Sequence, residues 1–163
     1  MDIWVLRYGH RKVRDNRASA HVALVARAFG AKGIIFSGEK DEELVGRIKK
    51  VVREWGGEFE VGYEEDWKKI MTRFRQEGAC FVHLIMYGVP IEQEIRKIRG
   101  KGKKCLVLVG SQKVRPEVYK MADFNISITN QPHSEIAALA IFLDRCYEGK
   151  ELKKAGVGRV CGS

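Results

Sequence analysis

Short apolar runs alternate with amphipathic helical patterns along almost the whole chain, and this alternation constrains the fold more than any other feature. The apolar runs have the length of buried parallel strands and cover residues 3–6, 33–36, 59–63, 80–86, 105–109 and 124–128. Helical patterns lie at residues 18–29, 41–55, 65–76, 91–98, 116–121 and 133–147. This order predicts an α/β fold in which helices cover both faces of a parallel sheet.

The length and charge of the chain narrow its class. A chain of 163 residues is typical of one domain, so we expect residues 1–163 to fold as a single unit. Lys and Arg number 30 against 21 Asp and Glu, a formal net charge of +9, which favours a polyanionic partner, either nucleic acid or a membrane surface. Positive charge is concentrated in residues 7–17, where Asp15 is the only acidic residue. We therefore expect this basic stretch to be functional.

Several classes of protein find no support in the sequence. The cysteines lie too far apart for a CxxC metal site, and the glycine-rich nucleotide fingerprints are absent. No metal-ligand or paired-carboxylate motif stands out, although a triad assembled in space stays open. No apolar run approaches the ~18 residues of a membrane span, and the first residues lack signal-peptide features. We expect a cytoplasmic protein that binds neither metal nor membrane.

Ligands of open α/β sheets bind beside the carboxyl ends of the strands, so the loops after the strands are the places to search for a site. Unusual sequences follow four of the predicted strands, at residues 8–17, 83–88, 110–113 and 129–135. The first interleaves arginine with an aromatic residue and glycine, as phosphate-binding loops do; the alternative is a solvated charge run. Asp15 could hold one of its arginines in a bidentate pair.

Two of these loops have simple structural alternatives. Gly110, Ser111 and Gln112 place polar side chains where backbone can approach a ligand, yet many strands end in a glycine turn for no functional reason. His83 is more often a core or strand-end histidine than a ligand. The backbone groups of residues 84–88 are better candidates, because main-chain N–H and C=O groups can bind an adenine edge.

Residues 130–135 open the longest apolar helical pattern. Asn130 or Gln131 could cap this helix, and Pro132 suits its first turn, so part of the segment needs no function. Five hydrogen-bonding side chains nevertheless gather at this one junction, which is more than a cap requires. They could bind an adenosine, a carboxylate or a ribose.

Taken together, these motifs resemble one family. The resemblance rests on residues 7–17, 21–22, 26–31, 83–88, 110–114 and 130–135, in that order, and spans nearly the whole chain. The family is that of the archaeal tRNA (cytidine-2′-O)-methyltransferases of the SPOUT superfamily, which modify cytidine 56 in the T-loop. The chain departs from the family pattern at Ala20, Ile85 and Thr129.

The resemblance implies a SPOUT-type α/β fold with a deep trefoil knot at about residues 80–148, a short tail at 149–163, and a homodimer that acts on tRNA. Physical rules alone favour an unknotted sheet, because chains rarely thread loops. The resemblance also implies that S-adenosylmethionine is the methyl donor, held by the loops after the fourth, fifth and sixth strands. The implied cofactor-binding residues are Leu84, Gly88, Gly110, Ser111, Gln112, Lys113, Val114, Ile128, Thr129, Asn130, Gln131, Pro132, His133, Ser134 and Glu135.

The basic stretch acquires roles from the same resemblance. Related enzymes use an arginine of this region, contributed across the dimer; Arg17 is the first candidate for the catalytic residue and Arg14 the second. Since an arginine has a pKa above ~12, it would orient the hydroxyl and bind phosphate, while phosphate or water takes the proton. The residues implied to bind RNA are Arg7, His10, Arg11 and Lys12.

Two other functions stay open at this point. One is a catalytically inactive SPOUT-like RNA-binding module that keeps the fold and the basic stretch without methyl transfer. The other is a nucleotide-binding protein that does not bind RNA, which the basic stretch disfavours. Binding of S-adenosylmethionine and a steep salt dependence of tRNA binding distinguish the three.

Overall fold

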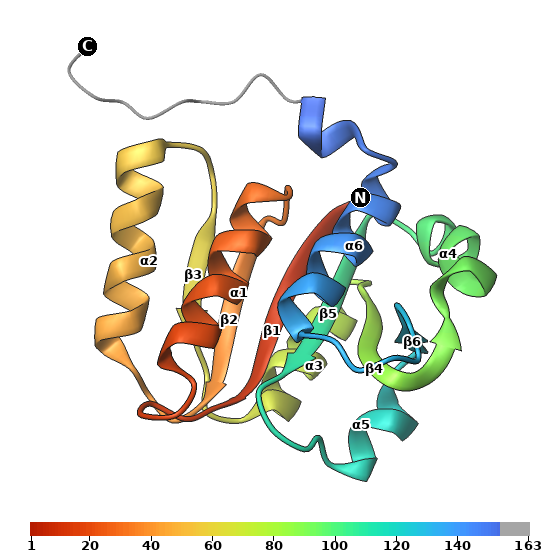
Figure 1. Cartoon of the computed structure of the whole chain (residues 1–163), viewed down its shortest axis with the longest axis horizontal. Coiled ribbons are helices and arrows are strands. Elements are labelled where there is room, and N and C mark those ends of the chain that lie inside the picture. The colour runs from red at the N-terminus through yellow and green to blue at the C-terminus, as the bar shows by residue number, and fades with distance from the viewer. Residues whose placement is uncertain (154–163) are drawn as a thin grey trace.

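A six-stranded sheet forms the centre of the computed structural model, which describes residues 1–153 (Figure 1). Its strands are β1 (Asp2–His10), β2 (Gly33–Gly38), β3 (Glu60–Tyr63), β4 (Cys80–Pro90), β5 (Lys104–Gly110) and β6 (Phe124–Ser127). They lie in the order β3-β2-β1-β5-β4-β6, and each neighbouring pair is parallel. The predicted parallel α/β fold is confirmed.

Helices cover both faces of this sheet. They are α1 (Asn16–Ala28), α2 (Glu42–Trp55), α3 (Trp67–Gln76), α4 (Ile91–Gly100), α5 (Pro116–Met121) and α6 (Glu135–Tyr147), followed by a 3-10 turn at Lys150–Lys153. Helices α1, α2, α4 and α6 contribute to one core, and α3 and α5 to the other. Strand side chains alternate between the two, so that Val5 enters the first core and Leu6 the second. Because both faces are buried, the strands stand out in the sequence as apolar runs.

Strand β1 continues to His10, although the sequence predicted its end at Leu6. Arg7 pairs with Phe36 of β2 on one side and Val109 of β5 on the other. Residues 7–10 do not form an apolar run, so the sequence did not predict that they belong to the strand. Residues 8–10 of the predicted basic loop are therefore central sheet.

Strand β4 leaves its ladder partway along. Leu84 and Val89 both pair with Ile126 of β6, so the residues between them arc away from the sheet. Gly88 closes this arc against β6, where an added Cβ would lie 2.5 Å from the carbonyl oxygen of Asn125. Only glycine fits so close to another backbone.

Helix α6 begins two residues later than its pattern predicted, and its cap differs from both residues proposed. Ser134 caps the helix, because its Oγ accepts a hydrogen bond from the N–H of Ala137 at 3.1 Å. Asn130 and Gln131 lie further upstream and do not cap it. The predicted tail lies mostly outside the described residues, which end at Lys153.

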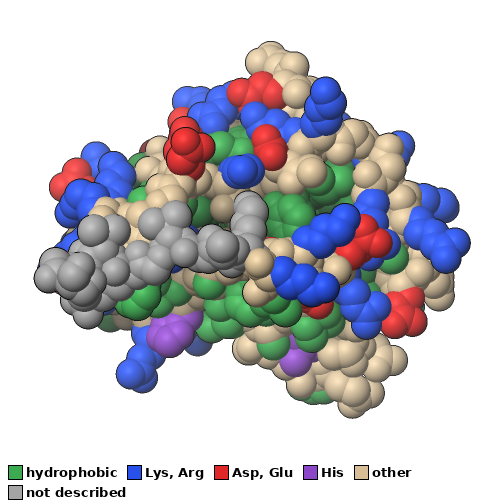
Figure 2. Space-filling model, turned by 90° about the horizontal axis from the view of Figure 1, so that it is seen from above, with side chains coloured by type: hydrophobic (Ala, Val, Ile, Leu, Met, Phe, Trp, Pro, Cys, Tyr) green, Lys and Arg blue, Asp and Glu red, His purple; other side chains and the backbone are tan. Residues whose placement is uncertain are grey.

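Within the described residues, no helix is long and apolar enough to cross a membrane. Lys and Arg side chains are interspersed with Asp and Glu on the face seen in Figure 2, as on an ordinary solvated surface. Cys80, Cys105 and Cys146 are buried and free, as expected for incidental thiols, and Cys161 lies outside the described residues.

Candidate active site

A cavity of about 860 Å³ lies between the outer part of β4 and the segments that follow β5 and β6. Its walls come from residues 83–87 of β4, from residues 109–110 and 112–114, and from parts of the segment 126–135, with contributions from α5 and from Ala138 of α6. Three segments far apart in the sequence therefore meet at one hollow. Its volume falls in the range of ~300–1,000 Å³ typical of small-molecule sites.

Many of the predicted cofactor-binding residues line this cavity. They are Leu84, Gly110, Gln112, Lys113, Val114, Ile128, Pro132, His133 and Glu135. Others are not part of its wall, namely Gly88, Ser111, Thr129, Asn130, Gln131 and Ser134. Tyr119 and Lys120 of α5 also line the cavity, and nothing in the sequence of α5 beyond its helical pattern predicted this. His83, predicted to be a core or strand-end residue, is fully buried and also borders the cavity.

The loop before α6 keeps its polar groups at the surface. Thr129, Asn130, Gln131 and His133 are all exposed. Their hydrogen bonds stay within the loop: the N–H of Gln131 donates to Oγ1 of Thr129 at 3.2 Å, and Nε2 of Gln131 donates to Oδ1 of Asn130 at 3.1 Å. Of these four residues, His133 lines the cavity.

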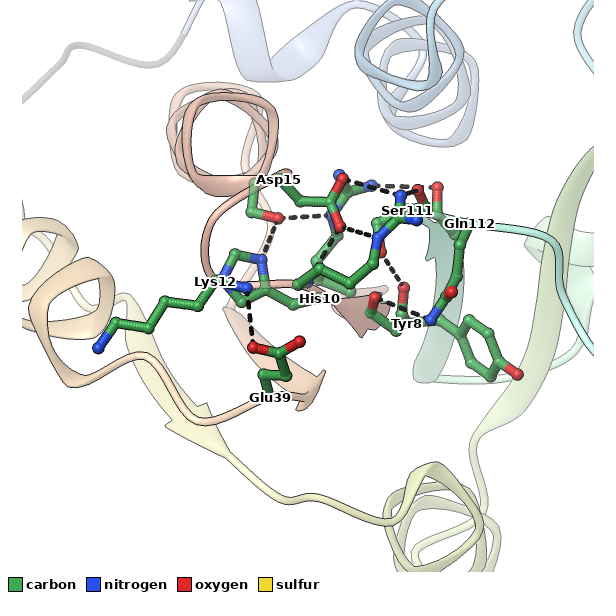
Figure 3. A network of polar contacts seen from close by, with 12 residues as sticks. Tyr8, His10, Lys12, Asp15, Glu39, Ser111 and Gln112 are labelled. Carbon is green, nitrogen blue, oxygen red and sulfur yellow. Dashed lines mark hydrogen bonds and ion pairs between the residues drawn. The ribbon is translucent and has the colours of Figure 1, made fainter.

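Ser111 and Gln112 turn toward β1. The Oγ of Ser111 donates to the carbonyl of Tyr8 at 2.8 Å, and Nε2 of Gln112 donates to the carbonyl of Gly9 at 3.1 Å (Figure 3). Gly9 has a φ of +72°, and an added Cβ would lie 2.7 Å from Nε2 of Gln112. The side chain of Ser111, predicted to bind cofactor, joins the end of β5 to the end of β1 through this bond.

Residues 11–17, here called the arginine loop, are shaped by a bidentate pair. The Nε of Arg11 donates to Oδ2 of Asp15 at 2.8 Å, and its NH2 donates to Oδ1 at 3.2 Å. The same guanidinium reaches the carbonyl of Ser111 at 2.9 Å. Burial by itself would raise the pKa of Asp15, but the hydrogen bonds from Arg11 outweigh it and lower that pKa. The predicted pairing of Asp15 with an arginine is confirmed.

Arg7 and His10 do not present a surface to RNA, because both side chains are buried. The guanidinium of Arg7 bonds to the carbonyl of Gly110 at 3.1 Å and to Oε1 of Glu135 at 3.2 Å. Burial lowers the pKa of Arg7, and the nearby Glu135 opposes that shift. The prediction that the side chains of Arg7 and His10 contact RNA directly is therefore corrected. Both residues are part of the framework beneath the arginine loop.

Lys12, Arg14 and Arg17 point outward instead. All three are exposed, and in the part of the chain that the structure describes their side chains make no hydrogen bond or ion pair. Val13, between two of them, is 96% exposed. Unpaired cations on a shaped loop are suited to bind phosphate.

Among residues 1–153, no group of three His, Cys, Asp or Glu side chains gathers in a way that could hold a metal ion.

Comparisons with known proteins identify the family. Residues 55–158 match the family described as "tRNA ribose 2′-O-methyltransferase, aTrm56". The tRNA (cytidine(56)-2′-O)-methyltransferase of Methanocaldococcus jannaschii is 54% identical over 155 residues, which cover 93% of this chain and 85% of the relative. The enzyme of the same name from Staphylothermus marinus is 51% identical over 152 residues, covering 93% and 82% of the two chains.

Solved structures share the fold at low sequence identity. The SpoU methyltransferase AviRb from Streptomyces viridochromogenes, in complex with the cofactor AdoMet, has a TM-score of 0.65 at 13% identity, covering 92% of this chain and 60% of AviRb. The TrmH/SpoU tRNA modifying enzyme of A. aeolicus has a TM-score of 0.60 at 16% identity, covering 93% and 76%. With the identities of about 50% to the archaeal enzymes, these findings show that the chain belongs to the aTrm56 family of tRNA ribose 2′-O-methyltransferases.

Proposed function

We propose that this chain transfers a methyl group from S-adenosylmethionine to the ribose 2′-hydroxyl of cytidine 56 in tRNA. One observation carries the proposal. Residues 110–112 connect a small-molecule cavity to the arginine loop, in which Arg14 and Arg17 are unpaired among the described residues. A methyl donor in the cavity and a phosphate backbone on the loop would be held at the same edge of the sheet. The names of the archaeal relatives favour this enzyme over an inactive RNA-binding module.

The cavity residues fit S-adenosylmethionine. Leu84, Val114 and Ile128 give the wall apolar surface for an adenine ring. His133 on the wall, together with the exposed side chains of Asn130 and Gln131 in the same loop, suits ribose hydroxyls and a carboxylate. The carboxylate of Glu135 on the wall is paired with the buried Arg7, whereas Lys113 and Lys120 add positive charge to the wall. That sign complements the carboxylate of the methyl donor.

The donor, when bound, supplies an electrophilic methyl group on positively charged sulfur. The protein then has to hold the 2′-hydroxyl in line with that methyl group and let its proton leave. Arg17, in the first turn of α1, is our first candidate to orient the hydroxyl, and Arg14 is the second. Neither would accept the proton, because an arginine pKa lies above ~12, so a phosphate or water takes it.

The proposal includes the trefoil knot and the homodimer of the family. Two features support the knot: the chain passes from β5 to β6 across β4, and α6 then returns to pack against α1. Apolar side chains left exposed on these two helices, Leu24 at 38% and Ile141 at 42%, support a paired surface. A single domain of residues 1–163 and action in the cytoplasm stay predictions.

The test is methyl transfer from labelled S-adenosylmethionine to a tRNA transcript. We expect label on a transcript with cytidine 56 and none on one with 2′-deoxycytidine at that position. Arg17→Ala should lower kcat by about a hundredfold, the scale expected for losing one group that orients the reacting atoms. Arg53→Ala removes an exposed arginine of α2 and serves as the control. Equal labelling of both transcripts would overturn the proposed site of methylation.

A further inference from the structure

Three buried polar residues beneath the arginine loop have no role in the mechanism above. They are Ser19 of α1, His10 of β1 and Asp41, which caps α2. Oγ of Ser19 lies 2.7 Å from Nδ1 of His10, and Nε2 of His10 lies 2.9 Å from Oδ2 of Asp41. Buried polar groups are expensive unless each is bonded, so three in a row call for an explanation.

The donors and acceptors in this chain can be assigned. Nε of Arg7 donates to Oγ of Ser19 at 3.0 Å, because a guanidinium can only donate. The hydroxyl proton of Ser19 is then free for Nδ1 of His10. His10 accepts there and donates from Nε2 to Asp41, whose carboxylate can only accept. The neutral Nε2–H tautomer of His10 satisfies every member of the chain.

The two ends of the chain reach the two halves of the proposed site. At one end, Arg7 bonds to Glu135 and Gly110, both of which line the cavity. At the other, Oδ2 of Asp41 accepts from Nδ2 of Asn16 at 3.2 Å, and Asn16 directly precedes Arg17 in the first turn of α1. A continuous line of hydrogen bonds thus connects the cavity wall to the backbone that carries Arg17.

We propose that Ser19, His10 and Asp41 are positioning residues for methyl transfer, which fix the start of α1 relative to the cavity. The proposal rests on the proposed function. None of the three side chains touches the reactants. They act through the placement of neighbours, and a misplacement of about 1 Å can cost a hundredfold in rate.

Two minimal substitutions test the proposal in the full chain. Ser19→Ala removes one oxygen, and Asp41→Asn keeps the cap acceptor for Leu44 while replacing the acceptor of His10. Asp66→Asn is the control, because the exposed Asp66 also caps a helix, accepting from the N–H of Lys68 in α3, and bonds to none of the site residues. We expect Ser19→Ala and Asp41→Asn each to lower kcat by on the order of tenfold or more. The Kd of S-adenosylhomocysteine, measured by calorimetry, should stay within about threefold of wild type.

Two further readouts separate positioning from simple loss of stability. Because both residues act through one chain, the double variant should lose little more kcat than either single variant. Nitrogen chemical shifts should show His10 as the Nε2–H tautomer in wild type and a changed tautomer in Asp41→Asn, a measurement that needs no methylation. Folded variants with kcat within twofold of wild type, or with losses that multiply in the double variant, would overturn the proposal. Wild type that fails to methylate tRNA would overturn the proposed function instead.

Discussion

The loop from β1 to α1 and the loop from β6 to α6 use their polar side chains in opposite ways. In the first, His10, Arg11 and Asp15 bond to one another or to residues of other elements, including Asp41 and Ser111. In the second, residues 129–133 are exposed, and within residues 1–153 they bond only to one another. Both loops are rich in hydrogen-bonding residues, yet only the first forms side-chain hydrogen bonds with other elements of the protein.

This difference separates a framework from a recognition surface. A loop whose polar groups are already bonded keeps its shape before any ligand arrives, and so holds the exposed arginines ready. A loop whose polar groups face solvent can give them to a ligand at low cost. Substitutions in the first loop should therefore affect stability, and substitutions in the second should affect binding.

The substitution expected to damage the framework most is Arg7→Met, which replaces the aliphatic part of the side chain and removes the guanidinium donors. Gly110, Ser19 and Glu135 then lose their partner. We expect a loss of about 3 kcal/mol in the free energy of unfolding, measured with urea. A loss below about 1 kcal/mol would mean that Arg7 is not part of a framework.

The opposite result is expected from Asn130→Ala combined with Gln131→Ala. These side chains are exposed, so the free energy of unfolding should change by less than about 0.5 kcal/mol. The Kd of S-adenosylhomocysteine should rise about tenfold, as expected for losing one or two hydrogen bonds to ligand. Gln93→Ala, at an exposed position of α4, is the control and should change neither quantity. An unchanged Kd in the double variant would contradict a recognition role for this loop.

Ser134, in the second loop, has a structural role because it caps α6, and Ser134→Ala tests that role. Loss of the cap on α6 should cost about 1 kcal/mol of unfolding free energy. Ser134→Asp should restore that stability, since aspartate is an equally good cap. Failure of aspartate to restore it would show that Ser134 acts by some means other than capping.

The smallest expected effect concerns acid. The pKa of Asp15 is lowered in the folded protein, so its stabilising contribution is present above the unfolded pKa of ~3.9 and is lost as pH falls through the lower folded value. Because Arg11 is partly exposed, this contribution should be below about 1 kcal/mol. Melting temperatures of wild type and Asp15→Asn between pH 6 and pH 3 should converge toward the acid end. Parallel curves would exclude this linkage.

The elements of the fold could be predicted because both faces of the sheet are buried. Apolar runs such as residues 105–109 have no other explanation in a chain of this size, and the helical patterns between them are strong. The end of β1 could not be predicted, because residues 7–10 are strand only by virtue of their neighbours in β2 and β5.

The candidate site was predictable as a set of loops but not as a set of contacts. Residues 84, 110–114 and 128–135 were expected near one ligand, and most of them line one cavity. The burial of Arg7 could not be foreseen, because its partners Ser19, Gly110 and Glu135 lie 12, 103 and 128 residues away. An arginine in a basic stretch looks like a surface residue until those partners are placed in space.

The bonds that shape the arginine loop have a consequence for the order in which the molecule assembles. The loop is synthesised well before its partner, because Arg11 reaches the carbonyl of Ser111 over a separation of 100 residues. Contacts this distant in sequence form late in folding. Until residue 111 has been synthesised, the growing chain carries the positive charges of this loop without their arrangement.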